Sequence, residues 1–256
     1  MKIATWNVNS IKSRLPLLLD WLKREAPDVL LLQEIKCEND AFPALEIQSA
    51  GYHFLVKGQK AYHGVAMLSK KPASLRYDAL PGDEANAQAR YIEAEFDGCI
   101  VASIYLPNGN PVGTDKFSYK LDWMERLAKH MAGLLKEEKP VVLGGDYNVI
   151  PENIDARTPE RWKNDALFQP QSRAHFRALL NMGYYDAFRL KHGNVPHAYT
   201  FWDYQANAYD TDNGIRIDHL LLSPEAADRL KSCRIDKEER AKSKASDHVA
   251  VTVELG

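Results

Sequence analysis

Carboxylates, amides and a histidine stand at the ends of several apolar runs in this sequence. The set comprises Asn7, Asn9, Glu34, Asp146, Asn148, Asp218, Asp247 and His248. Apolar runs of this kind are expected to be buried, and a buried carboxylate is costly unless it is paired, hydrogen-bonded or bound to a cation. Carboxylate and amide oxygens suit Mg²⁺ or Mn²⁺ better than Zn²⁺. Together these residues predict a site for a hard divalent cation.

Each of these motifs, taken alone, has a simpler structural interpretation. An Asp-x-Asn sequence such as Asp146 to Asn148 is usually a turn, because both side chains bond nearby backbone. Asp247-His248 is of a kind more often found as a surface pair, and Asp218 could be a charge on an edge strand. If each motif had only a structural role, several polar residues would have to end buried apolar runs for unrelated reasons. A single shared site explains all of them, so the joint pattern favours a catalytic or metal-binding site.

The apolar runs that precede these residues predict the elements that position them. Residues 2–8, 29–32 and 141–143 are typical of strands, the last two buried on both faces. Asp97-Gly98, between 91–96 and 100–105, predicts a hairpin, because that tight turn favours Asp-Gly. Further strands are expected at 52–56, 64–69, 199–204, 216–222 and 249–255, with 199–204 and 216–222 paired around a long connection. Helical spacing of apolar residues predicts helices around 15–22, 121–135 and 176–180.

The composition is that of an ordinary globular protein. The chain has 256 residues, of which 45% are hydrophobic and 27% charged, and a net charge of −2. The charge total argues mildly against a nucleic-acid binder, although an acidic metal site would mask a basic rim. Three distant cysteines indicate free thiols in a reducing compartment. No apolar run approaches the ~20 residues of a membrane span, so we expect a cytoplasmic protein without membrane attachment.

Eight motifs occur in a fixed order along the chain and carry a resemblance to a known family. They are Trp6-Asn7-Val8-Asn9, Leu32-Gln33-Glu34-Ile35-Lys36, Gly64-Val65-Ala66, Tyr105-Leu106-Pro107-Asn108, Gly145-Asp146-Tyr147-Asn148, Thr200-Phe201-Trp202, Arg216-Ile217-Asp218 and Ser246-Asp247-His248. The sequence resembles the exonuclease III family of Mg²⁺-dependent apurinic/apyrimidinic (abasic-site) endonucleases, within the endonuclease/exonuclease/phosphatase superfamily. The resemblance covers essentially the whole chain and implies an α/β fold, a four-layer α/β sandwich. In that fold two mixed β-sheets pack face to face with helices outside, and here residues 1–256 would form a single domain.

The resemblance also implies roles for the residues of the expected site. Glu34 would be the principal metal ligand, and the wider metal set would be Asn7, Asp146, Asn148, Asp247 and His248. Asp146 would deprotonate the attacking water, and Asn148 would hold that water or a phosphate oxygen. His248, oriented by Asp218, and Tyr105 would donate to the phosphate. Asn9 stands where some relatives carry Asp, which weakens one metal contact at most.

The implied substrate is double-stranded DNA with abasic sites or 3′ ends, bound by a monomer. The implied contacts are Asn9, Lys36, Arg90, Asn108, Phe201, Trp202, Arg216 and Ile217. Phe201, Trp202 and Ile217 resemble an apolar pocket for a flipped-out abasic sugar, although such aromatic residues are more often plain core. The connection 205–213 is expected to press into a DNA groove, against which its Asp210 and Asp212 argue.

The expected reaction is Mg²⁺-dependent hydrolysis 5′ to an abasic site, leaving a 3′-hydroxyl, with 3′→5′ exonuclease and 3′-end-cleaning activity. Mn²⁺ is a possible substitute. Two alternatives stay open: an enzyme of the same superfamily acting on a phospholipid or inositol phosphate, and an inactive nucleic-acid-binding domain. The sequence does not determine the balance of the nuclease activities, the number of metal ions, sequence preference, RNA cleavage or protein partners.

Overall fold

Two six-stranded sheets form the centre of the molecule. The computed structural model describes residues 1–82 and 88–256. The first sheet has the order β11-β12-β1-β2-β4-β3. Its strands are β1 (Lys2–Asn7), β2 (Val29–Gln33), β3 (His53–Lys57), β4 (Val65–Ser69), β11 (Leu230–Ile235) and β12 (Val251–Leu255). Only β1 and β2 run parallel, and every other neighbouring pair is antiparallel.

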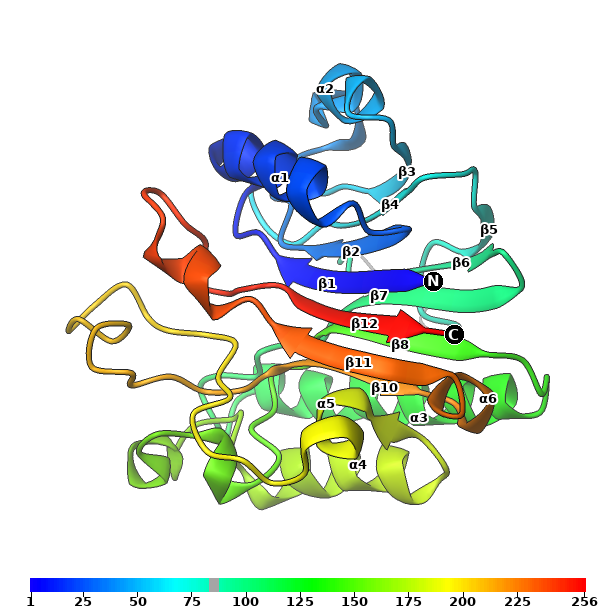
Figure 1. Ribbon diagram of the computed structural model, residues 1–256. Helices are drawn as coiled ribbons and strands as arrows, with labels where there is room; N and C mark the ends of the chain where they lie inside the picture. Colours follow the sequence, from blue (N-terminus) through cyan, green and yellow to red (C-terminus); the bar gives the residue numbers. More distant parts are fainter. Residues whose placement is uncertain (83–87) are drawn as a thin grey trace.

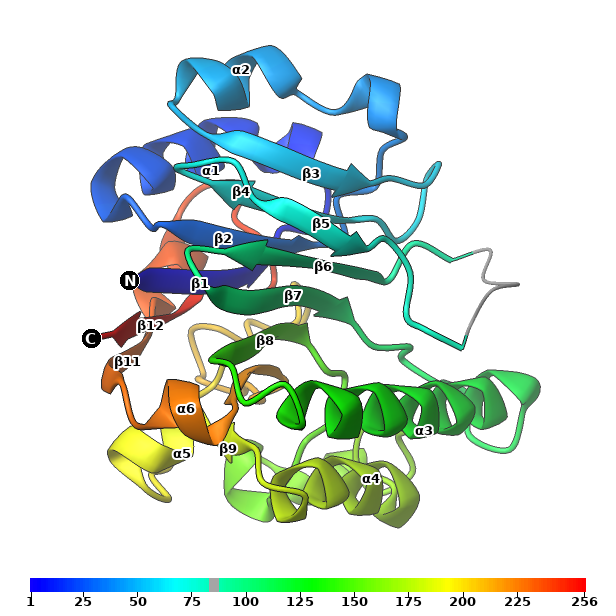
Figure 2. The same cartoon turned by 90° about the vertical axis from the view of Figure 1, so that its right-hand side faces the viewer.

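The second sheet repeats this arrangement in the order β5-β6-β7-β8-β10-β9. Its strands are β5 (Ser74–Tyr77), β6 (Tyr91–Phe96), β7 (Cys99–Tyr105), β8 (Val141–Asp146), β9 (Tyr185–Asp186) and β10 (Asp218–Leu222). Here β7 and β8 are the parallel pair. The two sheets face each other across a core that contains Leu31, Val101, Val142 and Val253 (Figure 2). Both sheets are therefore mixed, as expected from the resemblance.

Helices cover the outer faces of both sheets (Figure 1). The helices are α1 (Ile11–Glu25), α2 (Ala44–Ser49), α3 (Asp115–Leu135), α4 (Pro170–Asn181), α5 (Ala187–His192) and α6 (Pro224–Ala227). Short 3₁₀ helices occur at η1 (Asn39–Ala41), η2 (Asn153–Asp155), η3 (Pro159–Trp162) and η4 (Lys237–Ala241). Trp21 joins α1 to the first sheet, and Trp123 and Phe176 join α3 and α4 to the second. The expected four-layer α/β sandwich is confirmed.

The central parallel strands of both sheets end at one edge of the molecule, and this places the polar residues there. Asn7 ends β1, Glu34 follows β2, Tyr105 ends β7 and Asp146 ends β8. Gly144 lets β8 lie close to the other sheet, because a Cβ there would stand 2.6 Å from Leu220 Cδ2 and 2.8 Å from Leu31 Cδ1. A larger residue at this position would push the sheets apart just before Asp146.

The sequence predicts most elements correctly, with one wrong pairing. The hairpin at Asp97-Gly98 is confirmed, with φ of 47° and 76° at its two turn residues. Residues 199–204 and 216–222 do not pair as strands. Phe201 forms isolated bridges with Ile215 and His248, while β10 pairs with β8 and β9. The Thr200 hydroxyl accepts the backbone N–H groups of residues 217 and 218 at 3.1 Å, and so replaces a regular ladder.

The elements that sequence reading missed are short or polar. They are β5, β9, β11, α2, α5 and α6, and β11 buries little more than Cys233. All three cysteines are free and buried, as predicted. Within the described residues, no helix is long and apolar enough to cross a membrane.

Candidate active site

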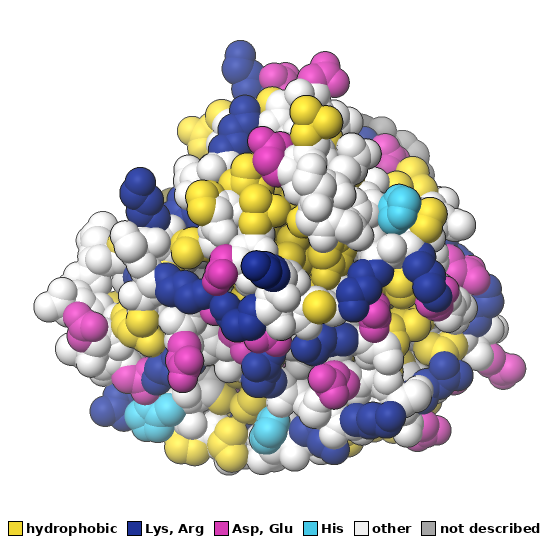
Figure 3. All heavy atoms as spheres, turned by 45° about the horizontal axis from the view of Figure 1, so that its top comes forward, with side chains coloured by type: hydrophobic (Ala, Val, Ile, Leu, Met, Phe, Trp, Pro, Cys, Tyr) yellow, Lys and Arg dark blue, Asp and Glu magenta, His cyan; other side chains and the backbone are white. Residues whose placement is uncertain are grey.

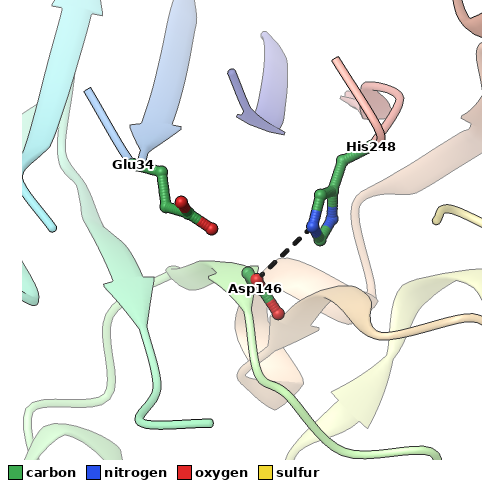
Figure 4. A group of neighbouring side chains, drawn as sticks. All are labelled: Glu34, Asp146 and His248. Atoms are coloured by element: carbon green, nitrogen blue, oxygen red, sulfur yellow. Dashed lines mark ion pairs between the residues drawn. The ribbon is translucent and has the colours of Figure 1, made fainter. Parts of the chain in front are cut away.

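Glu34, Asp146 and His248 converge at the strand ends (Figure 4). One ligand atom from each lies within 4.8 Å of the others. Asn7 joins the two carboxylates, since its Nδ2 donates to Glu34 Oε1 at 2.9 Å and to Asp146 Oδ2 at 3.0 Å. These residues come from opposite sheets, so the site exists only because the two sheets pack face to face. We call Glu34, Asp146, His248 and the adjoining Asp218 the strand-end cluster.

His248 is held between two carboxylates. Its Nδ1 lies 2.8 Å from Asp218 Oδ2, and its Nε2 lies 3.7 Å from Asp146 Oδ2. Asp218 pairs directly with Asp146 in the β8–β10 ladder, which places both carboxyl groups beside the imidazole. Burial alone would lower the pKa of His248, but Asp218 and Asp146 outweigh burial and raise it. The ring is therefore held as a cation with a fixed orientation.

Asp146 and Glu34 are in different electrostatic states. Burial raises the pKa of Asp146, and the neighbouring Asp218 and Glu34 charges add to that rise. Burial would also raise the pKa of Glu34, but hydrogen bonding from Asn7 and the charge of Lys36 lower it. The cluster thus gathers more carboxylate charge than His248 neutralises. Closely spaced carboxylates with this residual negative charge fit a hard divalent cation.

Asn9, Lys36 and Asp247 form the rim of the cluster. Asn9 Nδ2 donates to Asp247 Oδ1 at 3.0 Å, while Lys36 Nζ lies 2.5 Å from Asn9 Oδ1 and 3.0 Å from Glu34 Oε2. Asp247 therefore reaches the cluster through Asn9 and is not one of the three converging groups. Asn7 presents its amide N–H groups to the carboxylates and uses its side-chain oxygen for the backbone N–H of Asn9. The expected role of Asn7 as a metal ligand stays a prediction, and in this arrangement its amide links the two carboxylates.

Left-handed backbone is concentrated at the site. Asn9, Glu34, Lys36 and Asn148 have φ of 43°, 49°, 53° and 47°. Such conformations cost on the order of 1–3 kcal/mol each for residues other than glycine, and they persist where the surrounding structure fixes them. The rest of the folded structure therefore stabilises these four backbone conformations, which set the orientation of the side chains at the site.

Asn148 and Asn108 form an amide pair beside Asp146. Asn108 Nδ2 donates to Asn148 Oδ1 at 3.2 Å, and Asn148 Nδ2 donates to the Leu106 carbonyl at 2.9 Å. The backbone N–H of Asn148 donates to Asp146 Oδ1 at 2.9 Å. The amide of Asn148 and the carboxylate of Asp146 are therefore fixed relative to each other.

Tyr105 is held over the site by Arg90. Arg90 donates to the Tyr105 carbonyl at 3.1 Å, and its guanidinium lies 4.8 Å from the centre of the Tyr105 ring. Burial, together with the charges of Glu34 and Asp146, raises the pKa of Tyr105, so its hydroxyl keeps its proton. Arg90 is only 7% exposed. Its visible role is to support Tyr105.

Two of the expected substrate contacts have buried side chains that bind other residues of the protein, so their contact with a substrate stays a prediction. Arg216 is 1% exposed, and its guanidinium binds Asp155 and Asp186 at 2.7 Å each. Trp202 is fully buried and donates to Asp212 at 3.3 Å. Both side chains point into the core, because residues 199–217 run irregularly and alternate positions do not share a face. The sequence motifs identify these residues but do not show which way their side chains point.

Phe201 is the pocket residue that reaches the site. Its half-buried ring lies 4.9 Å from the His248 ring, and it packs with Trp162 on a cluster whose buried floor includes Ile217. A cavity of about 280 Å³ opens beside it. The cavity is lined by Arg161, Trp162, Asp165, Phe201, Asp203, Gln205, Ala206, Ala208 and Asn213. Trp162 ends the short 3₁₀ helix η3, in the connection between β8 and α4.

A second, basic cavity of about 370 Å³ lies next to the rim. It is lined by Ser13, Arg14, Tyr204, Arg240, Lys242, Lys244 and Ala245. Arg14 donates to the Ala245 carbonyl at 3.3 Å, two residues before Asp247. Figure 3 shows that, over the face it presents, Lys and Arg side chains alternate with Asp and Glu and form no continuous basic patch. The residues that line this cavity thus provide local positive charge, although the net charge of the whole chain is −2.

Comparisons with known proteins agree with this geometry. Residues 4–248 match the Endonuclease/Exonuclease/phosphatase family. Exodeoxyribonuclease III of Haemophilus influenzae is 31% identical over the full length of both chains. The structure superposes on an AP endonuclease from Archaeoglobus fulgidus with a TM-score of 0.95 at 35% identity, covering 100% of this chain and 99% of that one. It also superposes on the 3′ phosphatase NExo from Neisseria bound to a product DNA hairpin, with a TM-score of 0.96 at 37% identity and the same coverage.

Proposed function

Because this chain belongs to the endonuclease/exonuclease/phosphatase family and is a phosphodiester-hydrolysing nuclease, we propose that it repairs DNA by cutting on the 5′ side of abasic sites. Cleavage would leave a 3′-hydroxyl, and the same site would clean blocked 3′ ends and degrade strands 3′→5′. The observation that carries the proposal is the position of Phe201, whose ring packs against His248 of the strand-end cluster. An apolar surface for a sugar thus adjoins the groups that would act on its phosphate.

Asp146 would remove the proton from the attacking water. A base works best when its pKa lies near the operating pH, and the raised pKa of Asp146 brings it toward neutrality. Asn148, fixed to Asp146 by its own backbone N–H, would hold the water or a phosphate oxygen. As the water oxygen bonds to phosphorus, the bond from phosphorus to the 3′ oxygen breaks and that oxygen takes up a proton.

His248 and Tyr105 would stabilise the negative charge that develops on the phosphate oxygens. Asp218 binds Nδ1 of His248, which leaves Nε2 free to donate toward the substrate. Tyr105 keeps its hydroxyl proton and therefore also donates. Both donors are held before substrate arrives, so little reorganisation is needed during the reaction.

Glu34 and Asp146 would hold a divalent cation, which we propose is Mg²⁺, with Mn²⁺ as a substitute. Such an ion, when bound, supplies Lewis-acid stabilisation of phosphate charge. Lys36 would limit the negative charge at Glu34, and Asp247 would act from the rim through Asn9. Asn7 would hold Glu34 and Asp146 at the correct separation.

Phe201 and the adjoining cavity would accept the abasic sugar. Flipping a residue out of the helix costs least where no base has to be unstacked. Ile217 supports this surface from below, and Asn108 and the basic cavity around Arg14 and Lys244 would contact the DNA backbone. The monomeric state, the cytoplasmic location and the single domain expected from the sequence stay predictions.

The direct test is gel-resolved cleavage of three duplexes, each with Mg²⁺ and with chelator. One carries a stable abasic analogue, one is intact, and one is nicked with a 3′-phosphate. We expect rapid, metal-dependent incision at the abasic analogue. Trimming of ends alone would mean an exonuclease or end-cleaning enzyme, as the names of two relatives suggest for those proteins. No cleavage of any duplex would favour a phospholipid or inositol phosphate substrate, or an inactive binding domain.

A further inference from the structure

A lysine lies buried directly beneath the amide pair of the site. Lys120, in α3, is completely buried. Lysine is almost never fully buried unless its ammonium is paired. Here Nζ donates to the Asn148 carbonyl at 2.5 Å and to the Asn108 carbonyl at 3.0 Å. The ammonium is thus engaged with backbone oxygens of two residues whose side chains already form the amide pair.

The two carbonyl groups belong to different links of the chain. Asn108 lies in the link after β7, and Asn148 lies in the link after β8. Their side chains bond each other at 3.2 Å, and Lys120 bonds both backbones from below. Lys120 and the amide pair therefore close a ring of hydrogen bonds that ties the two links together.

The backbone of Asn148 lies in an uncommon conformation that the lysine helps to hold. Its φ of 47° is in the left-handed region, which asparagine tolerates better than most residues but which few residues other than glycine adopt. The carbonyl that Lys120 binds is that of the same residue, so the bond acts on the peptide group that follows this torsion. Without it, we expect the link to relax, and the carboxamide of Asn148 to leave its partners Asn108 and Leu106.

The space beneath the link is shaped around the lysine stem. A Cβ at Gly109 would stand 2.6 Å from Lys120 Cδ and 3.3 Å from Ala166 Cβ. Gly109 itself has a φ of 86°. The chain therefore passes over the lysine stem so closely that a side chain at position 109 would collide with it.

We propose that Lys120 is a positioning residue for cleavage, which keeps the Asn148 carboxamide paired with Asn108 and the Asn148 backbone N–H on Asp146 by holding the Asn108 and Asn148 carbonyls. This rests on the role of Asn148 in the proposed function. Lys120 itself touches no substrate, so its loss should lower kcat and leave DNA affinity nearly unchanged. A misplacement of about 1 Å in an active site costs up to about 100-fold in rate.

The test compares Lys120→Met with Lys129→Met, an exposed lysine on the same helix. Rates are measured on whichever duplex of the panel the wild-type enzyme cuts fastest, at a temperature where each variant is folded by circular dichroism. We expect K120M to lower kcat about 10- to 100-fold with KM and DNA Kd within about 3-fold, and K129M to match wild type.

A double-mutant cycle with Asn148→Ala separates positioning from general loss of structure. If Lys120 acts through Asn148, K120M should cause little further loss of kcat in the N148A background. An equal loss in both backgrounds, or a loss that appears in Kd, would overturn the proposal.

Side-chain amide signals offer a readout that needs no activity. In ¹H–¹⁵N spectra the Asn148 and Asn108 NH₂ signals, assigned from N148A and Asn108→Ala, should shift or broaden in K120M and not in K129M. Unchanged signals would contradict the proposal even if no duplex of the panel were cut. Failure of the proposed function would instead show as an inactive wild-type enzyme with these signals still sensitive to Lys120.

Discussion

Two buried charge clusters lie on either side of one short segment, and they behave in opposite ways. The strand-end cluster contains Asp218, and the second cluster contains Arg216, two residues earlier. We call this second group the arginine cluster. It consists of Asp155, Asp186, Arg189 and Arg216. Two carboxylates face two guanidinium groups there, so the charge is balanced.

The pKa of the aspartates shows the difference. Burial alone would raise the pKa of Asp186, but Arg216 and His219 outweigh burial and lower it. Burial raises the pKa of Asp146, and neighbouring carboxylates raise it further. Both residues are at most 6% exposed, so burial does not separate them. A balanced cluster holds the fold together, whereas the cluster with uncompensated negative charge is the one where we propose that a cation and a substrate bind.

The largest expected effect is the loss of cleavage in Asp146→Asn. The variant keeps the shape of the side chain but cannot take a proton from water, and we expect its single-turnover rate to fall by about 10⁴-fold. Its free energy of unfolding should change little, because removing a disfavoured buried charge offsets the one hydrogen bond, from Asn7 or Asn148, that asparagine cannot accept. Near wild-type turnover would show that Asp146 is not the base.

The same change in the arginine cluster should affect stability instead. Asp186→Asn keeps the acceptor that caps α5, at the backbone N–H groups of Phe188 and Arg189, but leaves Arg216 without one carboxylate. Breaking a buried pair in this way costs about 3 kcal/mol of unfolding free energy, measured by urea denaturation. The cleavage rate per folded molecule should be unchanged. A fall in that rate would show that the arginine cluster also contributes to catalysis.

The stability difference between wild type and Asp186→Asn should depend on pH in acid only. The folded-state pKa of Asp186 is depressed, so its contribution is complete above the ordinary aspartate pKa of about 4. The contribution is lost as pH falls through the depressed value. Urea titrations between pH 7 and pH 3 should therefore show a constant difference down to about pH 5 and a decline below about pH 4. A difference near zero throughout this range would mean that Asp186 is not strongly paired.

The smallest expected effect concerns the basic cavity. Lys244→Ala should weaken DNA binding equally for abasic and intact duplexes, and reduce the slope of log affinity against log salt by about 1. Fluorescence anisotropy at several salt concentrations measures this slope, with Lys129→Ala as the control. An unchanged slope would mean that the DNA backbone does not contact Lys244 in the basic cavity.

The strand ends were predictable from sequence because apolar runs and their polar ends are local patterns. Asn7, Glu34, Asp146, Asp218 and His248 do meet, although their positions span most of the chain. The division between the two clusters was not predictable. Arg216 and Asp218 are neighbours in an irregular segment, and only the packing of β8, β9 and α5 decides which of them faces the site.

Lys120 was expected, with other basic residues, to contact the DNA backbone, and its burial was not predicted for a related reason, although the sequence contains a signal. It shares the buried stripe of α3 with Phe117, Met124 and Leu127, where a lysine is out of place. A lysine on an apolar stripe indicates a buried partner, but its partners lie in links whose path the sequence does not show. Trp162 was missed because a short 3₁₀ turn leaves no periodic pattern.

The most direct test is to measure Asp146→Asn and Asp186→Asn side by side. Each variant changes one buried aspartate to asparagine, and each is assayed for single-turnover incision of the abasic duplex and for its free energy of unfolding. We predict that D146N loses cleavage and keeps stability, while D186N loses stability and keeps cleavage per folded molecule. If both variants lost stability to the same extent, or if D146N still cut the duplex, the division into a structural and a catalytic cluster would be wrong.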